Sequence, residues 1–239
     1  MTSSIRYMRL LTAGALLVAT AASALDVPRL HTDCTHACRV AAALDSADVP
    51  FDTLAYSLWA EPQYIPQVRF RIAHTGTAIL LNFIVKETGT VAHVDNDNGP
   101  VFRDACVEFF VSPSADSNYY NFEMNCIGTL LMQGGVSGTR RALATPEILA
   151  SVDRYTTFGN RPFESRTDTV EWMASMIIPK EAFFLDSIPS FDGMTMTANF
   201  YKCGGTDRNY ITWRAIDTAR PQFHRPECFD TLKFESSYN

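Results

Sequence analysis

The chain has 239 residues, 46% of them hydrophobic, and a formal net charge of −6 at pH 7. A chain with this negative charge lacks the clustered Lys and Arg that contacts with phosphate need, which argues against nucleic acid and anionic membranes as partners. Without a leader, the length fits one all-β domain with a full hydrophobic core, or at most two small domains.

The first 24 residues have the layout of a secretory signal peptide. Two basic residues, Arg6 and Arg9, precede a short apolar run that ends in the small residues Ala22-Ser23-Ala24. The run is too short to span a bilayer, and no later segment is long and apolar enough to do so. An ordinary buried helix is the alternative. We therefore expect a secreted or periplasmic protein cleaved near Ala24, with an N-terminal extension (25–49) before the main domain (50–239).

Six cysteines are present in the chain. Cys34 and Cys38 lie in "HTDCTHACRV" beside His31 and His36, a pattern that could form a small metal site. The paired ligands that would complete a zinc site do not follow, so a local disulfide or free thiols are favoured. Three other cysteines lie in segments with a strand pattern, where we expect free buried thiols: Cys106, Cys126 and Cys203.

Most of the chain after residue 66 alternates in hydrophobicity with a period of two, as strands do. The strongest patterns in chain order are 67–74 ("QVRFRIAH"), 77–87 ("TAILLNFIVKE"), 105–112 ("ACVEFFVS"), 119–128 ("YYNFEMNCIG"), 169–179 ("TVEWMASMIIP"), 193–203 ("GMTMTANFYKC"), 210–216 ("YITWRAI") and 228–235 ("CFDTLKFE").

Helical signals are few. The segment 145–152 has Thr145 as a cap with Pro146 in the first turn, and 179–184 favours a single turn. Residues 139–166 show the weakest strand pattern and are interpreted as a long surface excursion. Many strands with little helix predict an all-β, antiparallel two-sheet β-sandwich with jelly-roll or immunoglobulin-like layering and one or two short helices.

The strand at 105–112 carries a glutamate, Glu108, between Cys106 and Phe110. If this strand pairs with 119–128, Glu108 shares a polar face with Glu123 and Asn125. A solvated sheet face explains this pattern, and so does a partly covered concavity. Carboxylates and amides around aromatic walls would suit a ligand rich in hydroxyls.

Two ordered sets of residues carry a family resemblance. The first is Asp104-Ala105-Cys106-Val107-Glu108 with Phe102 before it; the second is Thr212-Trp213, then Phe223, then Phe229-Asp230. In order and spacing they resemble carbohydrate-binding module family 9 and its stand-alone relatives with a DOMON-like sandwich, over roughly residues 50–235.

The resemblance implies a β-sandwich that holds a mono- or oligosaccharide between two aromatic side chains. The matching positions are Phe102 and Phe223, where the best-described members have tryptophans. Glu108 matches a glutamate that contacts sugar hydroxyls, and Glu123 replaces an arginine. The candidate ligand-binding residues are Phe102, Asp104, Glu108, Glu123, Asn125, Trp213, Phe223 and His224.

The surroundings of these residues refine the expectation. Phe102 and Phe223 lie in polar, loop-like contexts, which favours the rim of a site over the core. Trp213 is in mid-strand and fits the core or the floor of a pocket. His224 is either a ligand donor or a solvated loop residue. Structural calcium occurs in the family, but "DNDNG" (95–99) lacks the closing glutamate of a standard calcium loop.

The predicted function is non-catalytic saccharide binding in support of polysaccharide catabolism, with a glycoside hydrolase system as the possible partner. One alternative is a glycoside hydrolase that uses Glu108, Glu123 and Asp104, because that chemistry needs a pair of carboxylates. The other is a haem-binding electron-transfer module, which the resemblance to DOMON-like domains raises, although the sequence shows no evident Met–His pair.

Overall fold

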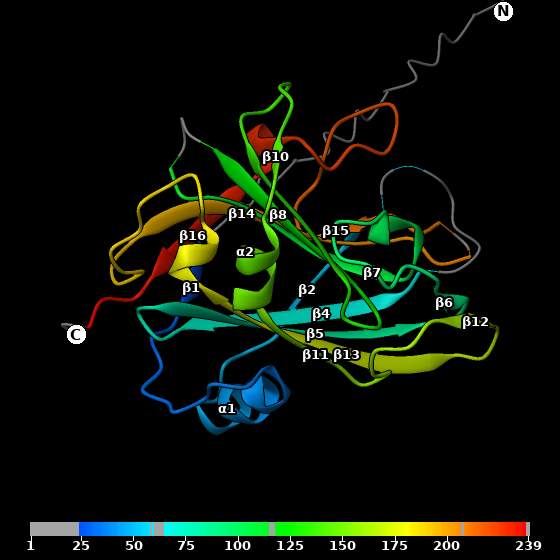
Figure 1. The fold of residues 1–239 in the computed structure, drawn as a ribbon, viewed down its shortest axis with the longest axis horizontal. Helices are drawn as coiled ribbons and strands as arrows, with labels where there is room; N and C mark the ends of the chain where they lie inside the picture. The colour runs from blue at the N-terminus through cyan, green and yellow to red at the C-terminus, as the bar shows by residue number, and fades with distance from the viewer. Residues whose placement is uncertain (1–23, 58, 60–64, 115–117, 207, 238–239) are drawn as a thin grey trace, which may run out of the picture.

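The computed structural model describes residues 24–57, 59, 65–114, 118–206 and 208–237. Apart from Ala24, the predicted signal peptide lies outside these residues. Two β-sheets pack against each other, as Figure 1 shows. One main hydrophobic core takes side chains from both sheets. This arrangement confirms the predicted β-sandwich.

The larger sheet has nine strands, and one path runs through seven of them. In spatial order these are β1 (Leu25–Val27), β16 (Asp230–Phe234), β14 (Thr195–Cys203), β7 (Cys106–Ser112), β8 (Tyr119–Asn125), β9 (Leu130–Gly135) and β10 (Ala142–Leu143). The remaining two are β15 (Ile211–Thr212), which pairs with β14, and β3 (Tyr56–Ser57), which pairs with β15. The strand pairs are antiparallel except for β1 with β16.

The second sheet has five strands and forms the other layer of the sandwich. Its order is β11 (Asp153–Thr156), β13 (Val170–Pro179), β5 (Ala78–Glu87), β4 (Gln67–His74) and β2 (Asp52–Thr53). A separate pair joins β12 (Phe163–Arg166) to β6 (Thr90–Ala92).

Aromatic side chains from both sheets meet in the core. Phe70 of β4 stacks on Phe200 of β14 with ring centroids 3.8 Å apart, and Phe200 stacks on Phe109 of β7 at 4.9 Å. Successive side chains of a strand point to opposite faces, so alternate positions share one face. These phenylalanines occupy the apolar positions of the alternating patterns. The alternation therefore explains which face of each strand is turned inward.

The opposite face of the larger sheet is also covered, which the alternation alone does not predict. A second hydrophobic cluster lies there, built from Phe110, Tyr119 and Tyr201 of the strands together with Ile216 and Phe223 of the C-terminal loops. All seven positions of β7 and of β8 are buried as a result. The loop between β15 and β16 thus adds a third layer over part of the sheet.

The segment 25–49, expected as an extension, packs onto the sandwich. Its first residues form β1 beside β16, and α1 (Val40–Ser46) follows the 3-10 turn η1 (Ala37–Arg39). Val40 and Leu44 of α1 bury against Ala73 and Leu80 of the smaller sheet. Figure 1 shows α1 on the face of that sheet turned away from the larger one.

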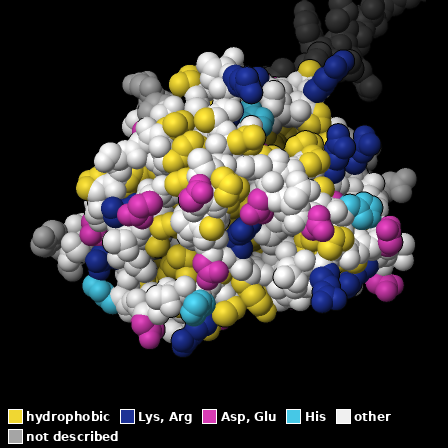
Figure 2. Space-filling model, in the orientation of Figure 1, with side chains coloured by type: hydrophobic (Ala, Val, Ile, Leu, Met, Phe, Trp, Pro, Cys, Tyr) yellow, Lys and Arg dark blue, Asp and Glu magenta, His cyan; other side chains and the backbone are white. Residues whose placement is uncertain are grey.

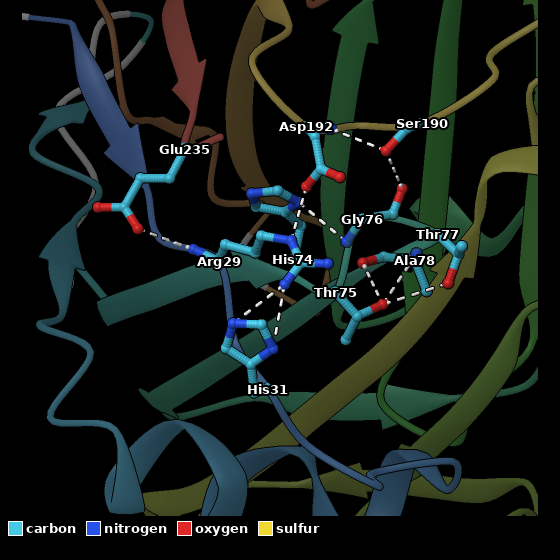
Figure 3. Close-up of polar contacts among 10 residues, drawn as sticks. All are labelled: Arg29, His31, His74, Thr75, Gly76, Thr77, Ala78, Ser190, Asp192 and Glu235. Carbon is cyan, nitrogen blue, oxygen red and sulfur yellow. Dashed lines mark hydrogen bonds and ion pairs between the residues drawn. The ribbon is translucent and has the colours of Figure 1, made fainter. Parts of the chain in front are cut away.

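Arg29 connects the end of β1 to the rest of the sandwich. Its Nε donates to Asp192 Oδ1 at 2.7 Å, and its backbone N–H donates to Glu235 Oε2 at 3.0 Å. Figure 3 shows these contacts beside His74, whose Nδ1 accepts the Gly76 N–H at 3.1 Å. Burial lowers the pKa of His74, so this histidine is neutral at pH 7.

The region 139–166 differs from the predicted surface excursion. It contains β10, β11, β12 and the helix α2 (Pro146–Ser151), and β11 is an edge strand of the smaller sheet. These strands are short and mostly exposed, so they lack the apolar alternation by which a strand is recognised. The predicted cap of α2 is confirmed, because the Thr145 hydroxyl accepts the Ile148 N–H at 3.4 Å.

The remaining helical turns are 3-10 turns: η2 (Val101–Arg103), η3 (Lys180–Ala182) and η4 (Pro226–Cys228). The first of these precedes β7 and carries Phe102, and the second falls where a single turn was expected. Within the described residues, the helices are all too short or too polar to cross a membrane.

Candidate binding site

A cavity of about 360 Å³ lies on the covered outer face of the larger sheet. Its floor is formed by side chains from four adjacent strands: Cys203 of β14, Glu108 and Phe110 of β7, Glu123 of β8, and Leu131 and Gln133 of β9. Its walls come from η2, which carries Phe102, and from the loop segment 221–224. The fold thus brings segments about 100 residues apart to one site.

Glu108 and Glu123 stand opposite each other on this floor, as register partners on β7 and β8. Both are almost fully buried, with exposed fractions of 2% and 4%. The Cys203 thiol donates to Glu108 Oε1 at 2.8 Å, and the Asn121 amide donates to Glu123 Oε1 at 2.9 Å. The predicted pairing of their two strands is confirmed, and the shared face is a covered concavity.

Burial raises the pKa of both carboxyl groups. The pKa of Glu123 rises to about 7, and that of Glu108 is well above its ordinary value, where the acidic neighbours Cys203 and Glu123 add to the effect of burial. Protons are therefore retained on the pair close to neutral pH. A carboxyl in this state can donate a hydrogen bond as well as accept one.

The aromatic walls differ in how they are held. Phe102 has 45% of its surface exposed and projects from η2. Phe223 is only 9% exposed and stacks on Tyr201, with Trp59 and Tyr210 also in contact. The expectation of a rim position holds for Phe102 and is wrong for Phe223. Phe223 is buried because its loop packs on the outer face of β14, where the Tyr201 hydroxyl donates to the Phe223 carbonyl at 3.2 Å.

His224 lines the cavity beside Phe223. Its Nδ1 lies 2.9 Å from the Tyr119 hydroxyl, and its ring centroid is 5.0 Å from that of Phe110. Burial, with a contribution from the nearby charge of Arg141, lowers the pKa of His224 to about 4. The imidazole is therefore neutral at pH 7. Of the two sequence interpretations, the structure places His224 at the cavity and not in solvent.

Asp104 and Asn125 do not line the cavity, contrary to expectation. Asp104 accepts the backbone N–H groups of His93 and Val94 at 3.0 and 2.9 Å and the Asn125 amide at 2.8 Å. Asn125 in turn accepts the Thr129 N–H at 2.9 Å. Both side chains satisfy backbone donors of turns, so they fix the turns next to η2 and are not free to bind a ligand.

Trp213 is also placed away from the cavity. Its ring packs edge-on against Phe70 and Phe200 in the main core, and its Nε1–H donates to Asp52 at 2.7 Å. Of the two sequence interpretations, the core is therefore the correct one. Trp213 faces inward because it follows β15, whose register sets it on the sandwich side of the sheet.

Several cavity residues were missed by the sequence reasoning. Gln222 belongs to a loop, where no periodicity marks a side chain that points to a site, and Tyr210 begins the predicted strand 210–216 but lies just before β15. Gln133 belongs to β9, which was not predicted as a strand; its register position opposite Asn121 places it on the polar face. Cys203 lies opposite Cys106 in a predicted strand, and the strand pairing could have revealed it only if the order of strands had been known.

Two groups of residues bear on metal binding. The ligand atoms of Cys106, Glu108 and Cys203 all lie within 4.8 Å of one another. In the "DNDNG" loop, Asp97 forms an ion pair with Arg154 at 2.8 Å and Asn98 bonds the Ala144 carbonyl. A carboxylate that already has a guanidinium partner does not fit a calcium ligand. All six cysteines of the chain are free in the structure, including Cys34 and Cys38.

The arrangement bears on the two alternative functions as well. The carboxylates of Glu108 and Glu123 face the cavity, whereas Asp104 is bound to backbone amides, so the three are not gathered around one bond. Met124 lies in the main core, while His224 is on the other side of the sheet. These two residues therefore do not form a pair of axial ligands for haem.

The surface shows no bias toward one charge on the face drawn in Figure 2. Acidic and basic side chains are interspersed there among hydrophobic ones, with the basic groups mostly toward the periphery. A nucleic-acid site would instead gather Lys and Arg on one stripe or patch.

A family model for carbohydrate-binding family 9 matches residues 39–234. A candidate carbohydrate-binding protein from Bacteroides uniformis ATCC 8492 is 44% identical, with a TM-score of 0.86 over 89% of this chain and 99% of its own. Two structures of a family 9 module from Caldicellulosiruptor kristjanssonii share the fold at 12% and 13% identity. The complex with cellotriose has a TM-score of 0.56 over 91% of this chain and 96% of its own, and the complex with glucose 0.54 over 91% and 98%. No curated protein matches the chain.

Proposed function

The chain belongs to carbohydrate-binding family 9, and on this basis we propose that it binds a mono- or oligosaccharide in the cavity between Phe102 and Phe223, without chemistry of its own. The observation that carries the proposal is the composition of this cavity. Two buried carboxyl groups form its floor, and an exposed aromatic ring stands at its mouth.

Each part of the cavity matches a part of a sugar. The apolar face of a pyranose ring packs on aromatic rings, which Phe102 and Phe223 supply. The ring hydroxyls donate and accept at once, as do a protonated and an ionised carboxyl side by side. Glu108 and Glu123 can therefore bond several hydroxyls without a water in between. The saccharide complexes of the Caldicellulosiruptor module support the ligand class.

Affinity measurements on the protein without residues 1–24 test the proposal. A glycan array would identify the saccharide, and titration calorimetry of wild type and Phe102→Ala would locate it. Truncation of Phe102 removes roughly 50 to 100 Å² of apolar contact, so we expect affinity to fall by about ten- to fifty-fold. Leu185→Ala is the matched control, because Leu185 is similarly exposed at 44% and lies outside the cavity lining. Equal affinity of Phe102→Ala and wild type would place the site elsewhere.

The proposal includes export and a role in polysaccharide breakdown. The N-terminal layout supports a cleaved signal peptide, and cleavage after Ala24 would leave Leu25, the first residue of β1, at the mature end. N-terminal sequencing of secreted or periplasmic protein checks this. A glycoside hydrolase system is the expected partner, and added protein should speed hydrolysis of a polysaccharide that it binds but not of one that it does not.

A further inference from the structure

We propose that the cavity prefers a cationic saccharide, one whose ring carries a free amino group, over its neutral counterpart. The inference rests on the proposed function and names the ligand class of the same site. It follows from the two carboxyl groups that face each other on the floor of the cavity, whose described lining includes no lysine or arginine.

The negative groups are held in place by the strand register. Glu108 and Glu123 face each other across β7 and β8, and both line the cavity. Within the described part of the chain, neither forms an ion pair, and each accepts its hydrogen bond from a neutral donor. Two buried like charges directly opposite each other are costly unless protons or a cation balance them.

The nearest positive side chains are engaged elsewhere. Arg141 lies 3.5 Å over the Tyr119 ring, and it donates to Asn121 Oδ1 at 2.7 Å and to the carbonyls of neighbouring strands. Its hydrogen-bonded link to Glu123 runs through the Asn121 amide, and its charge also acts on Glu123, whose pKa it lowers against the effect of burial. Lys202 is on the core side of β14, where it forms an ion pair with Glu87 at 2.7 Å. The described residues that line the cavity include no lysine or arginine.

The other titratable groups around the pair are neutral at pH 7. Burial raises the pKa of the Cys106 thiol to about 12, and a hydrogen bond with Cys106 together with burial raises that of Cys203. Burial also raises the pKa of Tyr201 and lowers that of His224 to about 4. None of these groups is positively charged at pH 7, so a ligand cation inside the cavity would favour ionisation of the carboxyl pair.

An ammonium group would gain contacts that a hydroxyl does not. It would donate charge-assisted hydrogen bonds to the carboxylates, and the lining includes the aromatic rings of Phe102, Tyr210 and Phe223, a type of side chain that attracts cations. Since the pKa of Glu123 is about 7 in the empty cavity, an incoming cation lowers it and releases a proton. A neutral sugar leaves the proton where it is. Proton release therefore distinguishes the two kinds of ligand.

Titration calorimetry with three matched probes tests the inference: β-1,4-linked trimers of glucosamine, of glucose and of N-acetylglucosamine. We expect the glucosamine trimer to bind at least about tenfold tighter than the other two at pH 7, as a charge-assisted bond would give. Repeating the titration in buffers of different ionisation enthalpy should show proton release with this trimer alone. Its affinity should rise from pH 5 to pH 7, as Glu123 loses its proton.

Two variants connect the preference to the carboxyl pair. Glu123→Gln keeps the shape of the side chain and should reduce the preference to within about threefold, with no proton release. Glu164→Gln makes the same change at a side chain that is 95% exposed and outside the cavity lining. This variant should retain both the preference for the glucosamine trimer and the proton release. A preference that survives Glu123→Gln would overturn the inference.

The outcomes separate this inference from the proposed function. Equal or tighter binding of the glucose trimer, or a glycan array that returns only neutral saccharides, overturns the preference and leaves the saccharide site in place. Absence of binding to every glycan overturns both.

Discussion

Phe223 lies flat on Tyr201, with ring centroids 4.2 Å apart and ring planes 6° apart. This stack joins the C-terminal loop to the outer face of the larger sheet and forms one wall of the cavity. Phe102, which also lines the cavity, has no comparable aromatic contact among the described residues and is half exposed. The two walls of one site are therefore built in different ways, and truncation should separate them.

We expect Phe223→Ala to lower the free energy of unfolding by about 2 to 4 kcal/mol, because it leaves a space between buried aromatic rings. Phe102→Ala should cost less than about 1 kcal/mol, because the ring is already in contact with water. Urea unfolding followed by circular dichroism measures both. If the two variants lost equal stability, Phe223 would be a rim residue after all.

Glu123 should make stability depend on pH. Its pKa is about 7 in the folded protein against an ordinary 4.5, so the folded state binds more protons than the unfolded one between these values. Stability contributed by the protonated form is therefore lost as pH rises through 7. Glu123→Gln cannot ionise, so we expect it to match wild type at pH 4.5 and to be roughly 2 to 3 kcal/mol more stable at pH 8.

The comparison between variant and wild type is needed because His224 acts in the opposite direction. Its pKa is lowered to about 4 from 6.5, so its contribution is full above pH 6.5 and is lost as pH falls toward 4. The contribution of His224 to stability is present in both proteins, so it cancels in the difference between Glu123→Gln and wild type. A difference that stays constant from pH 4.5 to pH 8 would contradict the raised pKa of Glu123.

The ion pair between Lys202 and Glu87 is buried between strands, with a distance of 2.7 Å and almost no exposed side-chain surface. Lys202→Met leaves the Glu87 carboxylate without its charge partner, although Trp172 still donates to it at 2.8 Å. We expect a loss of about 3 to 5 kcal/mol. The double variant Lys202→Met/Glu87→Gln should recover part of this loss, and thermal unfolding of the three proteins measures it. A double variant less stable than Lys202→Met would show that charge is not the cause.

The sequence predicted the strands better than the site. Alternation in 105–112 and 119–128 identified the inward and outward faces correctly, because a strand has only two sides and the core takes the apolar one. It could not show that the C-terminal loop covers the outer face, because a loop residue such as Phe223 carries no periodic signal. Polar residues next to the site, such as Asp104, looked like ligands although they bind backbone amides.

Gly204 should be intolerant of any side chain, because η2 packs directly against it. A Cβ at this position would approach the Asp104 carbonyl oxygen and the Phe102 carbonyl oxygen to within 1.8 and 2.8 Å, and φ is +71°. Both atoms belong to backbone, so the clash can be relieved only if the turn that carries Phe102 moves. We therefore expect Gly204→Ala to destabilise the fold by roughly 3 to 5 kcal/mol and, where it still folds, to weaken saccharide binding.

Gly159→Ala is the matched control for backbone strain. Gly159 has a similar φ of +78°, but a Cβ there would meet no atom within 4 Å. Its substitution should therefore cost only the strain of the left-handed conformation, about 1 to 2 kcal/mol, and leave affinity unchanged. Thermal melts and calorimetric titrations of both variants separate strain from steric contact. Equal effects at the two glycines would mean that the close approach between Gly204 and η2 does not position Phe102.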